Sequence, residues 1–186
     1  MIEVADLAQM DAALRVYDVD QHAWEQEPNG FYNNVGHVVL HLAKDITVKD
    51  FHSETVVRTA IAPDAVQYAL RLGRWSDEPL DNLMPSIQTA SKAAAAAKLN
   101  RVTDLHQAAH LAALATLAEN VHEAGHASTL EQAETNRRIV TRNAARLLLF
   151  SATEQASIFD FDLVAAFNTR LRSLRQRFGI PEPAKS

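Results

Sequence analysis

Uninterrupted helical periodicity is the feature of this chain that most constrains its fold. Apolar residues recur three or four positions apart from the start, as Leu7, Met10 and Leu14 illustrate, and this spacing is typical of one face of an α-helix. The 186 residues include only five Gly and six Pro, whereas Ala is abundant. That composition favours helices joined by short loops. No stretch has a convincing strand pattern, and we therefore predict an all-α helical bundle.

Turn and cap residues divide this pattern into successive helices. The turn signal at 28–30 follows the first helix, and Pro63 suits the first turn of the third. Asp160 or Asp162 lies where the N-cap of the last helix is expected. The expected helices cover about 3–18, 33 into the fifties, 63–75, 80–99, 103–128, 129–156 (as one or two helices) and 159–179.

Composition and charge exclude several classes of function. The chain has no Cys, which excludes disulfides, thiolate chemistry and cysteine-ligated zinc. Its formal net charge is −5 without a basic cluster, so electrostatics gives no support for nucleic-acid binding. The start of the chain is acidic where a signal peptide needs positive charge, and no apolar run approaches the roughly 18 residues of a membrane span. We expect a cytoplasmic protein with no nucleic-acid or membrane partner.

The two halves of the chain resemble each other in pattern. Three pairs of segments correspond: 41–51 with 110–120, 64–73 with 143–152, and 80–94 with 162–176. The first pair places the tripeptide that starts at His41 over the same tripeptide at His110. A repeat of this kind predicts two similar helical units. We place these units at 1–95 and 96–186 and expect them to pack as one globular domain.

The stretch LAENVHEAGHAS (117–128) contains the pattern His-Glu-x-x-His and resembles the motif of FtsH-type metallopeptidases. On a helix, His122 and His126 would share a face about 6 Å apart and could hold one zinc ion, with Glu123 polarising a water molecule. A third ligand is needed, and the candidates are Glu131, Glu134, Asp160 and Asp162.

Two further His-x-x-x-His pairs, 37/41 and 106/110, weaken the zinc interpretation. With eight histidines in a helical chain, some such pairs arise by chance. The ordinary interpretation of each is a partly buried or surface histidine.

The same stretch supports a second interpretation, in which its acids matter rather than its histidines. Glu119 and Glu123 lie one helical turn apart and would share a face. Two adjacent helices that each present two carboxylates can hold Mg²⁺, because this ion prefers oxygen ligands and binds phosphates while keeping some of its water.

This arrangement resembles the all-α nucleoside triphosphate pyrophosphohydrolases, the MazG-like group. LAENVHEAGHA (117–127) resembles the family's first acidic motif, and HLAKDITVKDF (41–51) resembles it with Asp45 as a retained acid. IAPDAVQYALRLGRW (61–75) resembles the second motif, whose aspartate matches Asp64. In the second half, Asn143 stands at the position of that aspartate, and the segment 159–179 resembles the closing helix.

The resemblance implies hydrolysis of a nucleoside triphosphate to the monophosphate and pyrophosphate, dependent on Mg²⁺ or Mn²⁺. The metal ligands would form a composite set of Asp45, Asp64, Glu119, Glu123 and Asn143. Glu119 and Glu123 would be catalytic, Lys44 and Arg142 would bind phosphate, and Trp24 would stack on the base. The family also implies a MazG-like bundle, with the two units packed as a pseudo-dimer, and a homodimer whose small-molecule partner is a nucleotide.

The departures from the family pattern keep other hypotheses open. Neither half keeps a full acidic quartet, since non-acidic residues replace family acids at Lys44, Val48, Ile61 and Val140. The alternative to an active hydrolase is a non-catalytic helical scaffold or binding protein that has lost the metal site. A zinc peptidase is the third hypothesis.

Overall fold

The computed structural model describes residues 2–21, 30–123 and 129–181, and within these ranges the regular structure is helical. The elements are α1 (Val4–Gln21), α2 (Gly30–Val48), α3 (Glu54–Val56), the π-helix η1 (Val57–Ile61), α4 (Ala62–Trp75), the 3₁₀ helix η2 (Leu80–Leu83), α5 (Ile87–Asn100), α6 (Leu105–Glu123), α7 (Leu130–Ile158) and α8 (Leu163–Phe178). No strand occurs in the described ranges, which confirms the predicted all-α class.

Helix boundaries follow most of the predicted turns, but the segment 80–99 is not one helix. Met84 and Ser86 have extended backbones on either side of Pro85, so η2 ends before it and α5 begins after it. Proline disfavours a helical conformation at the residue before it, and this restriction separates the two helices. α2 also ends at Val48, short of the predicted fifties, whereas the segment 129–156 forms the single helix α7.

Side-chain caps define several helix ends. Ser86 and Thr89 form a reciprocal capping box at the start of α5. Of the two candidates for the last N-cap, Asp162 has this role, since its Oδ1 accepts a hydrogen bond from the Ala165 amide at 3.0 Å. Gly179 ends α8 with a φ of 66°, a left-handed conformation that glycine adopts easily.

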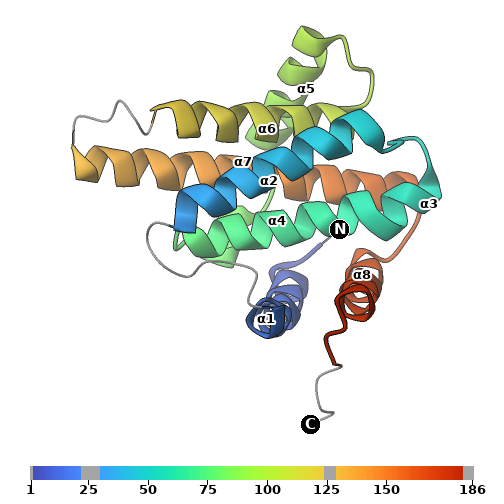
Figure 1. Cartoon of the computed structure of the whole chain (residues 1–186). Helices are drawn as coiled ribbons and strands as arrows, with labels where there is room; N and C mark the ends of the chain where they lie inside the picture. Colours follow the sequence, from blue (N-terminus) through green and yellow to red (C-terminus); the bar gives the residue numbers. More distant parts are fainter. Residues whose placement is uncertain (1, 22–29, 124–128, 182–186) are drawn as a thin grey trace.

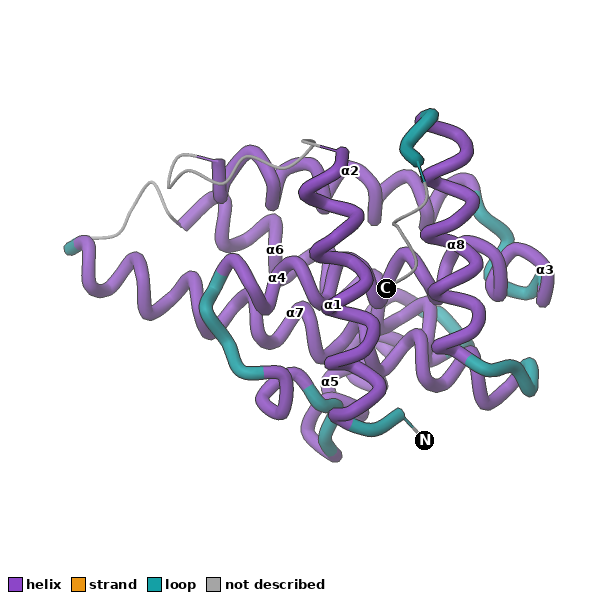
Figure 2. Tube along the Cα trace, turned by 90° about the horizontal axis from the view of Figure 1, so that it is seen from below, coloured by secondary structure: helices purple, strands orange, loops and turns teal. Residues whose placement is uncertain are grey.

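α4 and α7 pack against each other in the middle of the bundle (Figure 1). α6 covers α7, α2 packs on α6, and α5 packs on both α6 and α7. On the opposite side, α1 and α8 lie next to each other and both contact α4, as the view from below shows (Figure 2). α4 is therefore surrounded by elements from both ends of the chain.

One hydrophobic core includes residues from both predicted units. Its fully buried members include Leu14, Leu42, Leu70, Leu117 and Phe167, which come from five different helices. Burial of each such side chain contributes roughly 1.5 to 3 kcal/mol to folding. Within the described ranges, none of the helices combines the length and apolarity needed to cross a membrane.

α4 differs from an ordinary amphipathic helix because it is buried continuously from Ala62 to Gly73. Three polar side chains, Asp64, Gln67 and Arg71, are among these buried residues. Polar groups removed from water must find partners within the protein, because an unpaired buried charge is very costly. The partners of these side chains define the candidate site.

Candidate carboxylate site

A polar stripe runs along α4. Asp64, Gln67, Arg71 and Arg74 follow one another at intervals of three or four residues, which places them on one face of the helix. The elements that pack on α4 include α1, α2 and α8. Helices α1 and α8 each supply a charged partner to the stripe, and the residue directly after α2 supplies another. The stripe is thus an interior polar contact rather than a solvated surface.

Two of the predicted metal ligands, Asp45 on α2 and Asp64 on α4, meet at one lysine. The Lys49 Nζ lies 2.8 Å from Asp45 Oδ1 and 3.2 Å from Asp64 Oδ2. Only 3% of Asp45 and 6% of Asp64 is exposed. The two carboxylates are therefore brought together as expected, with an ammonium group of the chain itself between them.

Asp64 also binds an arginine from the last helix. Arg170 Nε donates to Asp64 Oδ1 at 2.8 Å, and Arg170 Nη2 donates to Asp64 Oδ2 at 2.8 Å. Gln67 Nε2 donates to the same Oδ1 at 3.2 Å. Such a two-pronged pairing is the strong form of arginine–carboxylate contact. We call Asp45, Lys49, Asp64 and Arg170 the ionic cluster, and its two negative and two positive charges balance.

Burial and mutual charge shift the acid–base properties of the ionic cluster. Burial raises the pKa of Asp45, Lys49 lowers it in part, and the Asp64 charge raises it further. Burial lowers the pKa of Arg170, but the hydrogen bonds and charge of Asp64 more than offset this, so the net shift is upward. The nearby Tyr68 has a raised pKa, chiefly through burial and then through the two carboxylates. Burial and the Asp64 charge thus favour the neutral form of Asp45, and Lys49 opposes this upward shift of its pKa.

The stripe continues from the ionic cluster towards α1. Arg71 Nη2 lies 2.6 Å from Asp18 Oδ1, and Arg74 Nη2 lies 2.6 Å from Asp18 Oδ2. Arg74 Nε also lies 3.3 Å from Asp11 Oδ1. Charged contacts therefore connect α4 to both α1 and α8.

The other predicted ligand and substrate residues lie elsewhere or outside the described part. Glu119 is exposed on α6, Lys44 is exposed on α2, and Arg142 Nη1 lies 3.8 Å from Glu78 Oε1. Trp24 and the side chain of Glu123 lie outside the described residues.

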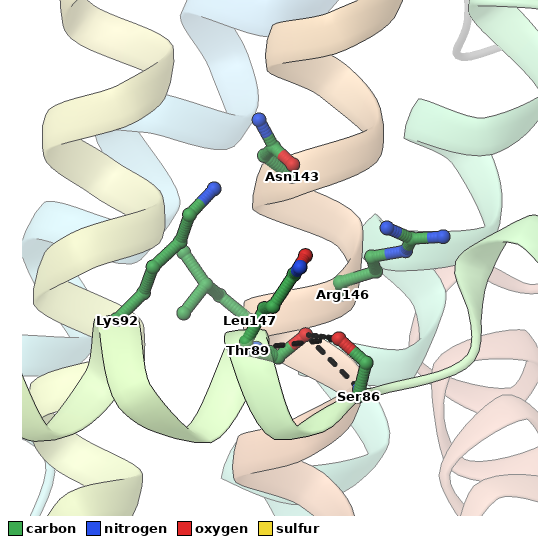
Figure 3. A pocket seen from close by; sticks show the side chains of 7 residues that line it. Ser86, Thr89, Lys92, Asn143, Arg146 and Leu147 are labelled. Atoms are coloured by element: carbon green, nitrogen blue, oxygen red, sulfur yellow. Dashed lines mark hydrogen bonds between the residues drawn. The ribbon is translucent and has the colours of Figure 1, made fainter.

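Asn143 faces α5 rather than the ionic cluster. It lines a small polar notch together with Ser86, Gln88, Thr89, Lys92, Arg146 and Leu147. Figure 3 shows Asn143 on α7 and Lys92 extending towards it from α5. The structure thus places Asn143 and the Asp45–Asp64 pair in different contacts between helices.

The residues of the zinc interpretation are also separated. Glu131 and Glu134 are exposed on α7, Asp160 follows the end of that helix, and Asp162 caps α8. The side chains of His122 and His126 are outside the described residues. In the part of the chain that the structure describes, no three His, Asp or Glu side chains are grouped closely enough to share a metal ion.

Sequence reasoning overlooked the two cations of the ionic cluster. Lys49 follows Asp45 by four residues, a spacing that favours an ion pair on a helix and could have been noticed. Arg170 lies 106 residues beyond Asp64 in the chain, and no local signal connects the two.

Two of the histidine pairs match their ordinary interpretation. His106 and His110 are buried, and His110 Nδ1 lies 2.8 Å from Ser151 Oγ on α7. Burial lowers the pKa of His110 to about 4, so the imidazole is neutral at pH 7. The rings of His37 and His41 lie 4.5 Å apart between centroids, with His37 exposed. These are packing histidines of the bundle.

Comparison of the chain with protein-family models, curated proteins and solved structures finds no match in any of the three. The MazG-like resemblance therefore rests on the motifs themselves.

Proposed function

We propose that this chain is a MazG-like helical protein that has replaced a divalent cation with its own Lys49 and Arg170, and that it acts as a non-catalytic binding or scaffold protein. The observation that carries this proposal is the ionic cluster. The family resemblance assigns Asp45 and Asp64 as metal ligands, whereas the chain's own cations contact three of their four carboxylate oxygens.

Charge balance supports this proposal. A divalent cation between two carboxylates would compensate their two charges, and an ammonium plus a guanidinium supplies the same compensation. The guanidinium is a poor candidate for displacement, because its paired hydrogen bonds match the carboxylate geometry. Glu119, which would complete a composite metal site, is exposed on α6 and has no place in the ionic cluster.

The packing of corresponding elements supports two tandem units within a pseudo-dimer. The sequence repeat matches α2 with α6 and α4 with α7, and each of these pairs is in contact. The repeat also matches the region of α5 with that of α8. α8 packs on α4, and α5 packs on α7, so each closing helix contacts the central helix of the other unit.

An active pyrophosphohydrolase is the second candidate, and one observation favours it. The raised pKa of the buried Asp45 carboxyl and its convergence with Asp64 are features that also occur in catalytic carboxylate sites. Under this hypothesis, Mg²⁺ and substrate would have to displace Lys49 from between the carboxylates.

Pyrophosphate release separates the two candidates. The purified chain is incubated with Mg²⁺ or Mn²⁺ and a panel of ribo- and deoxynucleoside triphosphates. We expect no release above a protein-free control. Metal-dependent release that is lost in Asp64→Ala and kept in Asp81→Asn, a change at an exposed carboxylate in η2, would establish the hydrolase instead.

Metal-dependent stability tests the replacement of the cation. Lys49→Ala leaves Asp45 without its lysine, and we expect a lower melting temperature that Mn²⁺ partly restores, because metal binding to the folded state stabilises it. The wild type should show no such response to Mn²⁺. The same absence of response in Lys49→Ala would show that the lysine does not occupy a metal position.

A further inference from the structure

An open cavity of about 340 Å³ lies between η1 and α8, on the outer side of the ionic cluster. Its lining consists of Arg58, Thr59, Asp162, Ala165, Ala166, Thr169, Arg170 and Ser173. The α8 members follow helical spacing and form one stripe of mostly small residues. These small side chains leave the space, and the volume falls in the range of small-molecule sites.

Arg58 supplies one positive charge to the cavity. It belongs to η1, a π-helical turn, and such turns frequently occur at functional sites. Its contact with Glu54 is 3.5 Å long and exposed on both sides, so it contributes little and is readily exchanged. The guanidinium carbon also lies 5.7 Å from the centre of the Phe161 ring.

Arg170 supplies the second positive charge. A guanidinium has five N–H donors, and the Asp64 contact uses the Nε donor and one Nη2 donor. Arg170 also lines the cavity, and Asp64 leaves its three other N–H donors unused. Asp64 therefore holds the Arg170 side chain in place without using all of its hydrogen-bonding capacity.

The remaining lining residues match an anion with a small organic body. Thr59, Thr169 and Ser173 add hydroxyl groups, and Ala165 and Ala166 add apolar surface. Asp162 brings a negative charge, but its Oδ1 accepts a hydrogen bond from the Ala165 amide as the cap of α8. A phosphate has three strong acceptor oxygens, which suits two guanidinium groups and three hydroxyls better than a single carboxylate would.

We propose that this cavity binds a phosphate monoester, with the phosphate between Arg58 and Arg170 and a small organic group against Ala165 and Ala166. The cavity volume of about 340 Å³ is more than inorganic phosphate fills. The site goes beyond the proposed function, because it uses the outer side of Arg170 and does not depend on whether the carboxylates bind a metal.

Calorimetric titration with phenyl phosphate and with inorganic phosphate at low ionic strength tests the site. We expect one phenyl phosphate per chain, bound more tightly than inorganic phosphate because of the apolar contacts. Arg58→Gln should weaken binding by about tenfold or more, as expected for the loss of one charge-assisted hydrogen bond. Ala165→Leu keeps every charge but fills the cavity, and it should weaken phenyl phosphate binding to a similar extent.

Arg177→Gln is the matched control, because it removes the same charge from an exposed position on α8 outside the cavity lining. It should leave the affinity within twofold of the wild type. Thermal melting of each variant verifies that it is folded. Three results would overturn the site: no saturable binding of either probe, equal weakening by Arg58→Gln and Arg177→Gln, or binding of inorganic phosphate alone. Pyrophosphate release and Mn²⁺ response are measured separately, so failure of this site leaves the proposed function untouched.

Discussion

The contact of α8 with α4 and the contact of α5 with α7 are built alike but differ in charge. In the first, the Asp64 carboxylate binds the Arg170 guanidinium. In the second, the amides Asn143 and Gln88 line a notch of about 20 Å³ together with the cations Lys92 and Arg146 (Figure 3). The sequence repeat places Asn143 over Asp64 and Gln88 over Arg170. The two corresponding positions therefore hold an ion pair in one contact and two neutral amides in the other.

A buried carboxylate and a buried amide differ in the partners that they need. An ionised carboxylate with little access to water needs a cation, whereas an amide needs only hydrogen-bond partners. The first contact therefore depends on two residues that must change together. The second can tolerate substitution of one residue at a time.

The largest loss of stability is expected when Arg170 is removed from the contact of α8 with α4. Arg170→Met leaves the buried Asp64 with Lys49 as its remaining cation, and removal of one partner from a buried ion pair costs about 3 to 4 kcal/mol. Urea denaturation measures this loss of unfolding free energy. Lys92→Met in the notch is the matched control and should change stability by less than about 0.5 kcal/mol.

The double variant Asp64→Asn/Arg170→Met tests whether the loss comes from the uncompensated charge. Neutralising both partners should recover a large part of the stability that Arg170→Met loses. A double variant as unstable as Arg170→Met would assign the loss to packing of the arginine stem instead.

Acid should lower the stability of the protein through a buried histidine. His110 on α6 has a folded-state pKa of about 4, below the ordinary value of 6.5. The unfolded chain therefore binds more protons between these two values. The stabilising contribution of the neutral imidazole is fully present above about pH 6.5 and is lost as the pH falls towards 4, on the order of 2 to 3 kcal/mol.

Urea denaturation at several pH values measures this loss. His110→Gln removes the titrating group and should flatten the dependence between pH 6.5 and 4, although it lowers stability at pH 7. His52→Gln, a change at an exposed histidine, is the matched control and should keep the wild-type slope. The pKa of Asp45 is shifted upward, so its protonation works in the opposite direction and relieves the cost of its burial. A slope unchanged in His110→Gln would contradict the assignment.

The smallest effect on stability is expected when the ion pair is introduced into the contact of α5 with α7. Asn143→Asp/Gln88→Arg installs the charged residues at the corresponding positions. Because Gln88 is exposed, we expect a coupling energy of only about 1 kcal/mol between the two changes. A double-mutant cycle in urea measures it. A coupling near zero would show that the two contacts do not correspond in geometry.

The sequence determined the helices of this protein and part of its candidate site. Helical periodicity and the scarcity of Gly and Pro led to the all-α class, and Asp162 and Gly179 mark helix ends through local backbone chemistry. Pro63, expected in the first turn of a helix, instead lies inside a continuous helical run from Glu54 to Trp75. The pairing of Asp45 with Asp64 was also expected, since the motifs place both acids on neighbouring helices. These features depend on residues close together in the chain, where spacing alone defines which side chains share a face.

Only the tertiary structure decided what surrounds the two carboxylates. Arg170 reaches Asp64 because α8 folds back onto α4, and the sequence contains no local signal for that contact across 106 residues. The cavity beside Arg58 likewise exists only where η1 meets α8. The physical reason is the same in both cases. A buried charge selects its partner by position in space, and helix packing, which sums many weak apolar contacts along the whole chain, sets that position.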